Sequence, residues 1–313
     1  MRIVFAGTPI AAVPTLQTLA SGPHDVAMVV TRPDAPLGRK RVLAPSPVAQ
    51  AADELGLEVL KTARLDETAT GRILEAEPEL GVVVAYGGLV REPLLSAPAR
   101  GWINLHFSLL PRWRGAAPVQ RALIAGDERT GAAVFRLVPE LDAGDVYDTL
   151  ERPIGADETA GDLLGSLSVA GAELVERVVD GIADGTAVPV PQVGEPTLAP
   201  KLALDDARLD LTLDARAVYA RLRGVTPEPG AFFTVGGTRV KVLAAARSAA
   251  EPLPPGALRL RAGHADVGTG TAPLELVTVQ PAGKRAMAAP DWLRGLPEGT
   301  SVEVDDTSSE AAS

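Results

Sequence analysis

The sequence predicts an α/β protein, with a parallel sheet in its first half and a small β-rich domain in its second half. In the first half, short apolar runs alternate with longer segments whose apolar residues recur at helical spacing, and this alternation is typical of a sheet with crossover helices. Four prolines then fall between residues 185 and 200 and indicate an extended linker. Beyond the linker, short strand-like runs separated by proline- and glycine-rich turns favour a β-barrel or sandwich.

The elements of the first half follow in order from this pattern. Strands are predicted at 2–7, 25–31, 57–61, 80–87, 101–107, 131–138 and 145–151. Helices are predicted at 8–20, 46–56, 65–77, 115–126 and 157–185. Ser46 can cap the second of these helices, and Pro47 suits its first position. The last helix closes the domain, with Leu163 and Leu167 at the start of its apolar stripe.

Three further runs, at 239–248, 256–262 and 274–281, predict strands of the second domain. We therefore expect a first domain over 1–184, a linker over 185–206, a second domain over 207–305 and a disordered acidic tail over 306–313. Residues 207–297 hold 12 lysines and arginines against 7 aspartates and glutamates, although the formal net charge of the chain is −10. The acidity of the whole argues against indiscriminate nucleic-acid binding, so any such role falls to basic segments.

The sequence excludes several classes of protein. No apolar run approaches the roughly 20 residues that span a bilayer, and the opening MRIVFAGTP is typical of a strand, not of a signal peptide. Cysteine is absent, which excludes disulfides, a thiol nucleophile and cysteine-ligated zinc. We expect a cytoplasmic protein without a membrane partner or a metal site. The first turn, VFAGTP, has the position of a Rossmann fingerprint but a single glycine, and a Walker A motif is also absent, so a dinucleotide site is not expected.

The stretch INLHFSLLPRWRG, residues 103–115, places two polar side chains on one face of a strand. Asn104 and His106 alternate with apolar residues, so the amide and the imidazole point the same way. Ligands of open α/β sheets bind beyond the carboxyl ends of central strands, and His106 lies close to such an end. A lone histidine on a strand is more often a hydrogen-bonded core residue, so the functional interpretation needs a second signal.

That signal is LDAGD, residues 141–145, in a loop between two predicted strands. Asp142 alone would be an ordinary turn aspartate, but this loop could bring its carboxylate over His106. Together Asn104, His106 and Asp142 supply an amide donor, a titratable imidazole and a carboxylate. This set suits acyl transfer through a tetrahedral intermediate. A serine or cysteine nucleophile is not required if the acceptor brings its own amine.

The motif INLHFSLLPRWRGAAPVQRALIAGD occurs here with LDAGD, FAGTP, TRPDAPLGRKRVLAPSPV, VVVAYG, PEPGAFF and QPAGKRAM. In this order and spacing, the set resembles the folate-dependent formyltransferases nearly from end to end. The resemblance implies a Rossmann-like catalytic domain followed by a small OB-like barrel domain that binds tRNA. It also implies that a monomer transfers the formyl group of 10-formyltetrahydrofolate to the α-amine of initiator methionyl-tRNA.

The resemblance also implies roles for individual residues. Asn104 and a protonated His106 would stabilise the oxyanion, while Asp142 would support His106 and assist proton transfer. The residues that it places against the folate are Ser108, Leu109, Leu110, Pro111, Tyr86 and Gly87. For Tyr86 and Gly87 the alternative is a plain strand end and turn.

Basic residues are the expected tRNA contacts. The loop at 32–48 would enter the acceptor end, where basic side chains contact phosphates and unpaired bases. The residues assigned to tRNA are Arg32, Arg39, Lys40, Arg41, Arg112, Arg114, Arg221 and Arg223. For the loop residues, Arg112 and Arg114 the alternative is ordinary surface charge, and Arg221 and Arg223 belong to the basic excess over 207–297.

Two residues depart from the family pattern: Phe107 follows the histidine where members have a small residue, and Glu228 stands where members often have tryptophan. The acceptor stays open, because a formyltransferase acting on glycinamide ribonucleotide or an amino-sugar nucleotide would use the same trio. The basic loop and the β-rich domain favour tRNA. A non-catalytic RNA-binding protein with this fold is a third possibility, and the complete trio counts against it.

Overall fold

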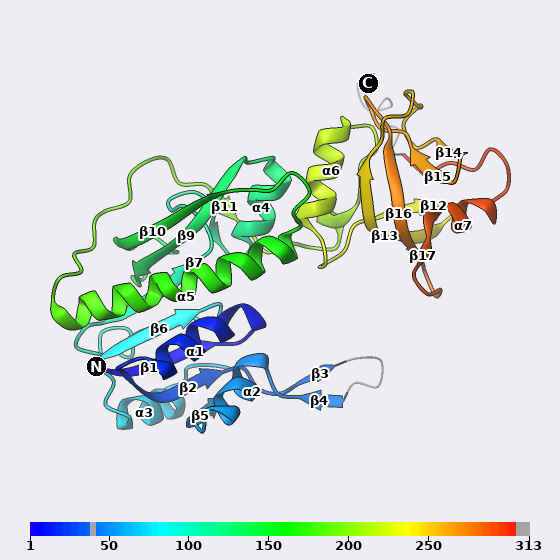
Figure 1. Cartoon of the computed structure of the whole chain (residues 1–313). Coiled ribbons are helices and arrows are strands. Elements are labelled where there is room, and N and C mark those ends of the chain that lie inside the picture. The colour runs from blue at the N-terminus through cyan, green and yellow to red at the C-terminus, as the bar shows by residue number, and fades with distance from the viewer. Residues whose placement is uncertain (38–41, 305–313) are drawn as a thin grey trace, which may run out of the picture. The chain divides into compact units, whose positions relative to one another are not determined.

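The structure is a computed structural model that describes residues 1–37 and 42–304 (Figure 1). Within these ranges the chain forms two compact units. The first unit contains residues 1–118, 129–153 and 164–199, and the second contains residues 119–128, 154–163 and 200 onward. Two short segments that precede residue 164 therefore belong with the C-terminal unit.

A seven-stranded sheet forms the first unit. In spatial order its strands are β10 (Val146–Pro153), β9 (Arg129–Arg136), β7 (Trp102–His106), β6 (Leu80–Val84), β1 (Arg2–Gly7), β2 (Asp25–Thr31) and β5 (Val59–Lys61). From β7 to β5 neighbouring strands are parallel, whereas the β7–β9 and β9–β10 pairs are antiparallel. The connection over 137–145 is shorter than the dozen or so residues that a parallel crossover needs, so β9 and β10 form a hairpin.

The first helix begins five residues later than predicted, after the 3₁₀ turn η1 (Ile10–Ala12), whereas the later helices of the first unit begin within three residues of the predicted positions. The helices are α1 (Val13–Ser21), α2 (Pro47–Glu54), α3 (Glu67–Glu75) and, from residue 164, α5 (Ala160–Asp184). The capping role of Ser46 is confirmed, because its Oγ accepts a hydrogen bond of 3.0 Å from the Ala49 backbone nitrogen. Helix α5 packs closely on β7: a Cβ at Gly171 would lie 2.8 Å from Cδ2 of Leu105. Glycine at this position therefore lets the helix approach the strand.

Two small strand pairs complete the first unit. The antiparallel pair β3 (Ala35–Leu37) and β4 (Val42–Ala44) lies within the segment 32–48, which was predicted as a basic loop. Arg39, Lys40 and Arg41 themselves lie outside the described residues. The parallel pair β8 (Arg114–Gly115) and β11 (Leu198–Ala199) joins the turn after β7 to the segment that follows α5.

The second unit is built on an antiparallel six-stranded sheet. In spatial order its strands are β12 (Phe232–Val235), β13 (Thr238–Arg247), β16 (Leu274–Pro281), β15 (His264–Val267) and β14 (Leu258–Arg261), with β17 (Met287–Ala288) paired to β16. Its helical elements are α4 (Pro118–Ala125), mostly within this unit, η2 (Asp205–Ala207), α6 (Ala215–Gly224) and α7 (Ala289–Arg294). Phe233 and Trp292 meet in its core with ring centroids 6.1 Å apart. The predicted fold class, a Rossmann-like sheet followed by a β-rich domain, is confirmed.

Candidate active site

Strand β7 carries Asn104 and His106 to the carboxyl end of the parallel strands. Asn104 pairs with Val83 of β6 and with Phe135 of β9, and His106 is the last residue of the strand. The two side chains share a face because they are two residues apart on a strand. They therefore reach the edge of the sheet at which open α/β sheets bind ligands.

The imidazole of His106 is buried, with 6% of its side chain exposed. Its Nε2 lies 2.8 Å from the backbone oxygen of Trp113. Because a carbonyl oxygen only accepts, Nε2 carries the proton of the neutral ring, and Nδ1 has a lone pair. Burial lowers the pKa of His106, and the charge of Asp142 and the Trp113 carbonyl oppose this effect. The ring is consequently neutral near pH 7.

The loop after β9 brings Asp142 to His106. Oδ2 of Asp142 lies 3.7 Å from Nδ1 of His106 and accepts a hydrogen bond of 2.7 Å from the Gly115 backbone nitrogen. Asp142 has a φ of 45°, a left-handed conformation that costs most L-residues about 1–2 kcal/mol and that Asp and Asn tolerate best. Glycine is required at 144, because a Cβ there would lie 1.8 Å from the Arg136 backbone oxygen.

A cavity of about 430 Å³ opens beside this pair. Its lining residues are Val83, Gly88, Leu89, Val90, Arg91, Glu92, Leu95, Asn104, Leu137, Val138, Pro139, Glu140, Leu141 and Asp142. The walls are mostly apolar, and Asn104 and Asp142 supply polar groups. The side-chain amide of Asn104 makes no hydrogen bond to another residue in the described part of the chain, so its donors are available to a ligand.

Sequence analysis did not single out the two segments that form most of this cavity, 88–95 and 137–141. The first follows the carboxyl end of β6, directly beside β7, so the rule that pointed to His106 could also have pointed there. The second follows β9, which runs antiparallel to β7, and no local pattern marks it. The residues predicted to contact folate, Ser108 to Pro111 with Tyr86 and Gly87, do not line the cavity.

The predicted residues after β7 shape the turn beneath His106. Ser108 is fully buried, and its Oγ donates a hydrogen bond of 2.6 Å to the Arg112 backbone oxygen. Pro111 is also buried. This turn places the Trp113 carbonyl against His106 and the Gly115 nitrogen against Asp142. The folate contacts expected from these residues stay a prediction.

Tyr86 lies at the end of β6 with 1% of its surface exposed. Burial raises its pKa, and the charge of Arg32 opposes the rise. The guanidinium of Arg32 in turn donates to the backbone oxygen of Ala63. Gly87 is exposed and has a φ of 78°. Tyr86 and Arg32 are thus neighbours, although they were predicted for different ligands.

Arg112 and Arg114 differ in their surroundings. The guanidinium of Arg112 lies 5.6 Å from the ring centroid of Trp113, and the residue is exposed. Arg114 donates from Nε and Nη2 to Oε1 of Gln192, over 3.1 Å and 2.5 Å. A phosphate contact by Arg114 would therefore compete with Gln192.

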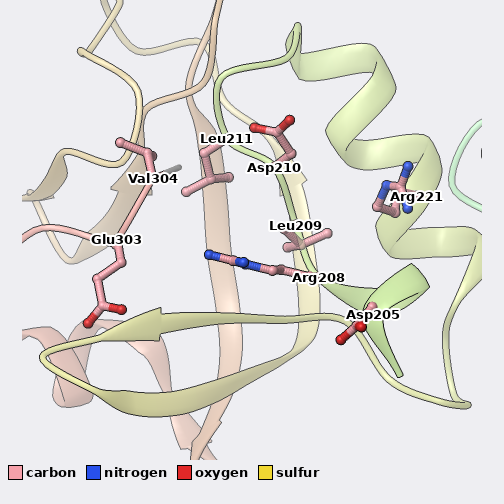
Figure 2. A pocket seen from close by; sticks show the side chains of 8 residues that line it. All are labelled: Asp205, Arg208, Leu209, Asp210, Leu211, Arg221, Glu303 and Val304. Atoms are coloured by element: carbon pink, nitrogen blue, oxygen red, sulfur yellow. The ribbon is translucent and has the colours of Figure 1, made fainter. Parts of the chain in front are cut away.

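Arg221 and Arg223 both lie on α6, but they line different cavities. Arg221 lines a cavity of about 210 Å³ with residues of the 205–211 segment, Glu303 and Val304. In Figure 2, Arg221 lies on the side of the view opposite Glu303 and Val304. Arg223 lines another cavity of about 610 Å³, together with Tyr219. Residues two positions apart on an α-helix point in directions that differ by about 200° around the helix axis, so these arginines do not form one face.

Main-chain oxygens already engage both arginines. Nη1 of Arg221 donates to the Asp206 oxygen over 2.8 Å, and Nη1 of Arg223 donates to the Gly155 and Glu158 oxygens over 3.1 Å and 3.2 Å. Burial also lowers the pKa of Arg223. Both residues therefore have structural roles within their unit, and tRNA contact stays a prediction.

Across residues 1–37 and 42–304, His, Asp and Glu side chains do not gather in any group of three or more that could hold a metal ion. In the same ranges, every helix is too short or too polar to cross a membrane.

The parallel sheet and the cavity at its strand ends, beside which Asn104, His106 and Asp142 come together, suit an enzyme that transfers a group to an acceptor. The family model described as formyl transferase matches residues 1–179, and the model of the formyl transferase C-terminal domain matches residues 201–297. A methionyl-tRNA formyltransferase of Leifsonia xyli subsp. xyli (strain CTCB07) is 64% identical over 295 residues, which cover 94% of this chain and 97% of the relative. The chain belongs to the formyl transferase family.

Solved structures share the fold at low sequence identity. HypX from Aquifex aeolicus in complex with tetrahydrofolic acid aligns with a TM-score of 0.63 and 18% identity, over 97% of this chain and 48% of HypX, so this chain spans about half of that protein's length. An N-formyltransferase from Helicobacter canadensis, in complex with folinic acid and dTDP-3-aminofucose, aligns with a TM-score of 0.66 and 15% identity, over 88% of this chain and 98% of that protein.

Proposed function

We propose that this chain transfers the formyl group of 10-formyltetrahydrofolate to the α-amine of initiator methionyl-tRNA, giving N-formylmethionyl-tRNA for translation initiation. The observation that carries the proposal is the strand-end cavity lined by Asn104 and Asp142, with His106 3.7 Å from the Asp142 carboxylate. The relative at 64% identity, named methionyl-tRNA formyltransferase, supports the tRNA acceptor.

The cavity suits the folate co-substrate. Its volume of about 430 Å³ lies within the range of roughly 300–1,000 Å³ that small-molecule sites occupy. Leu89, Val90, Leu95, Val138 and Leu141 would bury the apolar faces of the flat folate rings. Asn104 and Asp142 would meet its polar reacting end. Ser108 to Pro111, Tyr86 and Gly87 stay candidates for folate contact, although they do not line this cavity.

The chemistry follows from the three polar side chains. As the acceptor amine attacks the formyl carbon, a carbon–nitrogen bond forms and the carbonyl π electrons move to oxygen, where the Asn104 amide donates to the oxyanion. His106 takes the proton that the amine loses, on Nδ1, and Asp142 stabilises the imidazolium. Collapse of the intermediate then restores the carbonyl and breaks the bond to N10, and His106 returns the proton to N10.

This order of reaction steps differs in one respect from the roles that the family resemblance implies. There His106 is protonated from the start, whereas burial lowers the pKa of His106 in this chain. A ring that begins neutral can act as a base, and the Asp142 carboxylate stabilises the charge that the ring gains. The proton therefore reaches His106 during formyl transfer.

We further propose that residues 1–184 form the catalytic domain, that 185–206 link it to the tRNA-binding domain at 207–305, and that the protein is a cytoplasmic monomer. Arg32, Arg112, Arg114, Arg221 and Arg223 stay candidates for tRNA contact, as do Arg39, Lys40 and Arg41. Light scattering of the purified protein, alone and with tRNA, tests the monomer.

The first experiment follows formyl transfer from 10-formyltetrahydrofolate to initiator methionyl-tRNA. We expect turnover by the wild-type protein and its near-complete loss in His106→Ala. His264→Ala is the matched control, because the His264 side chain is 61% exposed. Absence of transfer by a folded wild-type protein that binds the folate would reject the tRNA acceptor.

A second candidate acceptor is a small amine, either glycinamide ribonucleotide or an amino-sugar nucleotide such as the one bound by the Helicobacter canadensis protein. The triple variant Arg39→Gln, Lys40→Gln, Arg41→Gln separates the candidates. We expect it to lose tRNA formylation while folate binding stays intact. The variant Lys61→Gln, Arg64→Gln, Arg72→Gln removes the same charge elsewhere on the first unit and controls for net charge. Unchanged tRNA turnover in the first variant would favour the small amine.

A further inference from the structure

Gln192 lies in the segment after α5. Its side chain contacts the two parts of the structure that hold Asp142, namely the loop of Asp142 itself and the turn at Arg114. Nε2 of Gln192 donates to the backbone oxygens of Asp142 and Gly144, over 2.8 Å and 2.9 Å. Its Oε1 accepts from Nε and Nη2 of Arg114, over 3.1 Å and 2.5 Å. All of these residues belong to the first unit.

The amide of Gln192 is fully used. A primary amide has two N–H donors and two acceptor lone pairs, and Gln192 makes two bonds with its nitrogen and two with its oxygen. The orientation of the amide is also determined, because the flipped amide would turn its oxygen toward two carbonyls and its nitrogen toward a guanidinium. Gln192 is held by four hydrogen bonds although its neighbour Val193 is 89% exposed.

These four bonds reinforce the geometry of Asp142 from two sides. On one side Gln192 holds the backbone of the loop in which Asp142 has a φ of 45°. On the other side it holds Arg114, whose neighbour Gly115 donates the 2.7 Å hydrogen bond to the Asp142 carboxylate. Loss of Gln192 would free both the loop and the turn that its carboxylate contacts.

The same segment also reaches the partner of His106. Oγ1 of Thr197 accepts from the Trp113 backbone nitrogen over 2.9 Å, and the Trp113 carbonyl is the group bonded to Nε2 of His106. β11 then pairs with β8 immediately after this contact. The chain between Gln192 and β11 is therefore tied to both the Asp142 loop and the His106 turn.

We propose that Gln192 is a positioning residue for formyl transfer, which aligns the Asp142 carboxylate with His106 by bridging the Asp142 loop and the Arg114 turn. The inference rests on the proposed function. It assigns a role in the reaction to a segment that otherwise serves as a linker. Gln192 does not itself line the cavity, so it acts through the Asp142 loop and affects the chemical step more than folate binding.

Two variants separate the contacts of Gln192. Gln192→Leu removes all four hydrogen bonds. Gln192→Glu keeps an acceptor for Arg114 but cannot donate to the two carbonyls, and its charge faces their oxygens. We expect both variants to lower kcat about 10- to 100-fold, because a displacement near 1 Å can cost about 100-fold in rate. The KM for 10-formyltetrahydrofolate should change by a smaller factor than kcat in both variants.

Val193→Ala controls for the position, and Gln17→Glu, on the exposed side of α1, controls for the change of amide to carboxylate. Circular dichroism at the assay temperature confirms that each variant is folded, and if Gln192→Leu is not, Gln192→Glu decides. A kcat within twofold of wild type in a folded Gln192 variant would overturn the proposal, as would a raised KM with unchanged kcat. Wild-type protein is assayed in parallel to distinguish the two hypotheses. Failure of the wild type to transfer formyl would reject the proposed function and this inference together, whereas an active wild type with unchanged Gln192 variants would reject the inference alone.

Discussion

Nδ1 of His106 faces Oδ2 of Asp142 across 3.7 Å, while the Asp142 carboxylate is held by a 2.7 Å hydrogen bond from Gly115. The carboxylate is thus fixed near the ring without bonding to it. A proton that arrives on Nδ1 would lie between the two groups. This arrangement links the pH dependence of the protein to one buried histidine.

Burial of His106 makes stability depend on pH. The pKa of His106 in the folded protein is lower than the ordinary histidine value of about 6.5, so in the interval between the two values the unfolded chain binds a proton that the folded chain does not. The free energy of unfolding therefore falls as pH drops below about 6.5, by up to about 1.4 kcal/mol per pH unit within the interval. Urea unfolding at pH 7.5 and 5.5 should show a smaller fall in His106→Gln than in wild type. Equal falls in the two proteins would contradict this account, and His264→Gln is the control.

Asp142→Asn tests the charge without disturbing the loop. Asparagine tolerates a positive φ as aspartate does, and its amide oxygen can still accept from Gly115. We expect kcat to fall about 10²- to 10⁴-fold, with folate binding retained. Histidine NMR should also show a still lower pKa for His106, because the opposing charge is gone. Asp148→Asn, at a half-exposed acid of β10, should be near wild type, and a similar loss in both variants would argue against a specific role.

Gly144→Ala tests the close approach of the Asp142 loop to β9. A Cβ at this position would lie 1.8 Å from the Arg136 backbone oxygen, so the loop must move and Asp142 must move with it. We expect a loss of about 1–3 kcal/mol in the free energy of unfolding and a fall in kcat. In α3, Gly71→Ala has open space around its Cβ and should be neutral or stabilising by up to about 1 kcal/mol. Chemical denaturation that ranks the two variants in the opposite order would refute this view of the loop.

Val138→Trp tests the cavity as the folate site. The indole would fill part of the volume of about 430 Å³ lined by Val138. The KM for 10-formyltetrahydrofolate should rise at least about tenfold, since one extra methylene in a hydrophobic pocket already costs about 1–3 kcal/mol. Val169→Trp, on the exposed side of α5, controls for the added indole. An unchanged KM in Val138→Trp would place the folate elsewhere.

Local sequence patterns predicted most elements of the fold and the shared face of Asn104 and His106. Alternation over a few residues sets which side chains share a face of a strand, and Ser46 with Pro47 marked the start of α2 correctly. The first helix begins later than predicted, at Val13, because residues 10–12 form a 3₁₀ turn. The divergence of Arg221 and Arg223 could also have been read from the helical period.

Contacts between distant residues could not be predicted in the same way. The bond from Gln192 to Asp142 joins residues 50 positions apart, and the 137–141 wall of the cavity returns to β7 through a hairpin. Such contacts depend on the path of the backbone through the whole sheet, and no local period encodes that path. The sequence therefore identifies the candidate side chains and the strand that presents Asn104 and His106, because these features depend on near neighbours. The distance from His106 to Asp142, the depressed pKa of His106 and the bridging position of Gln192 arise only when packing brings distant segments together and removes water from between them.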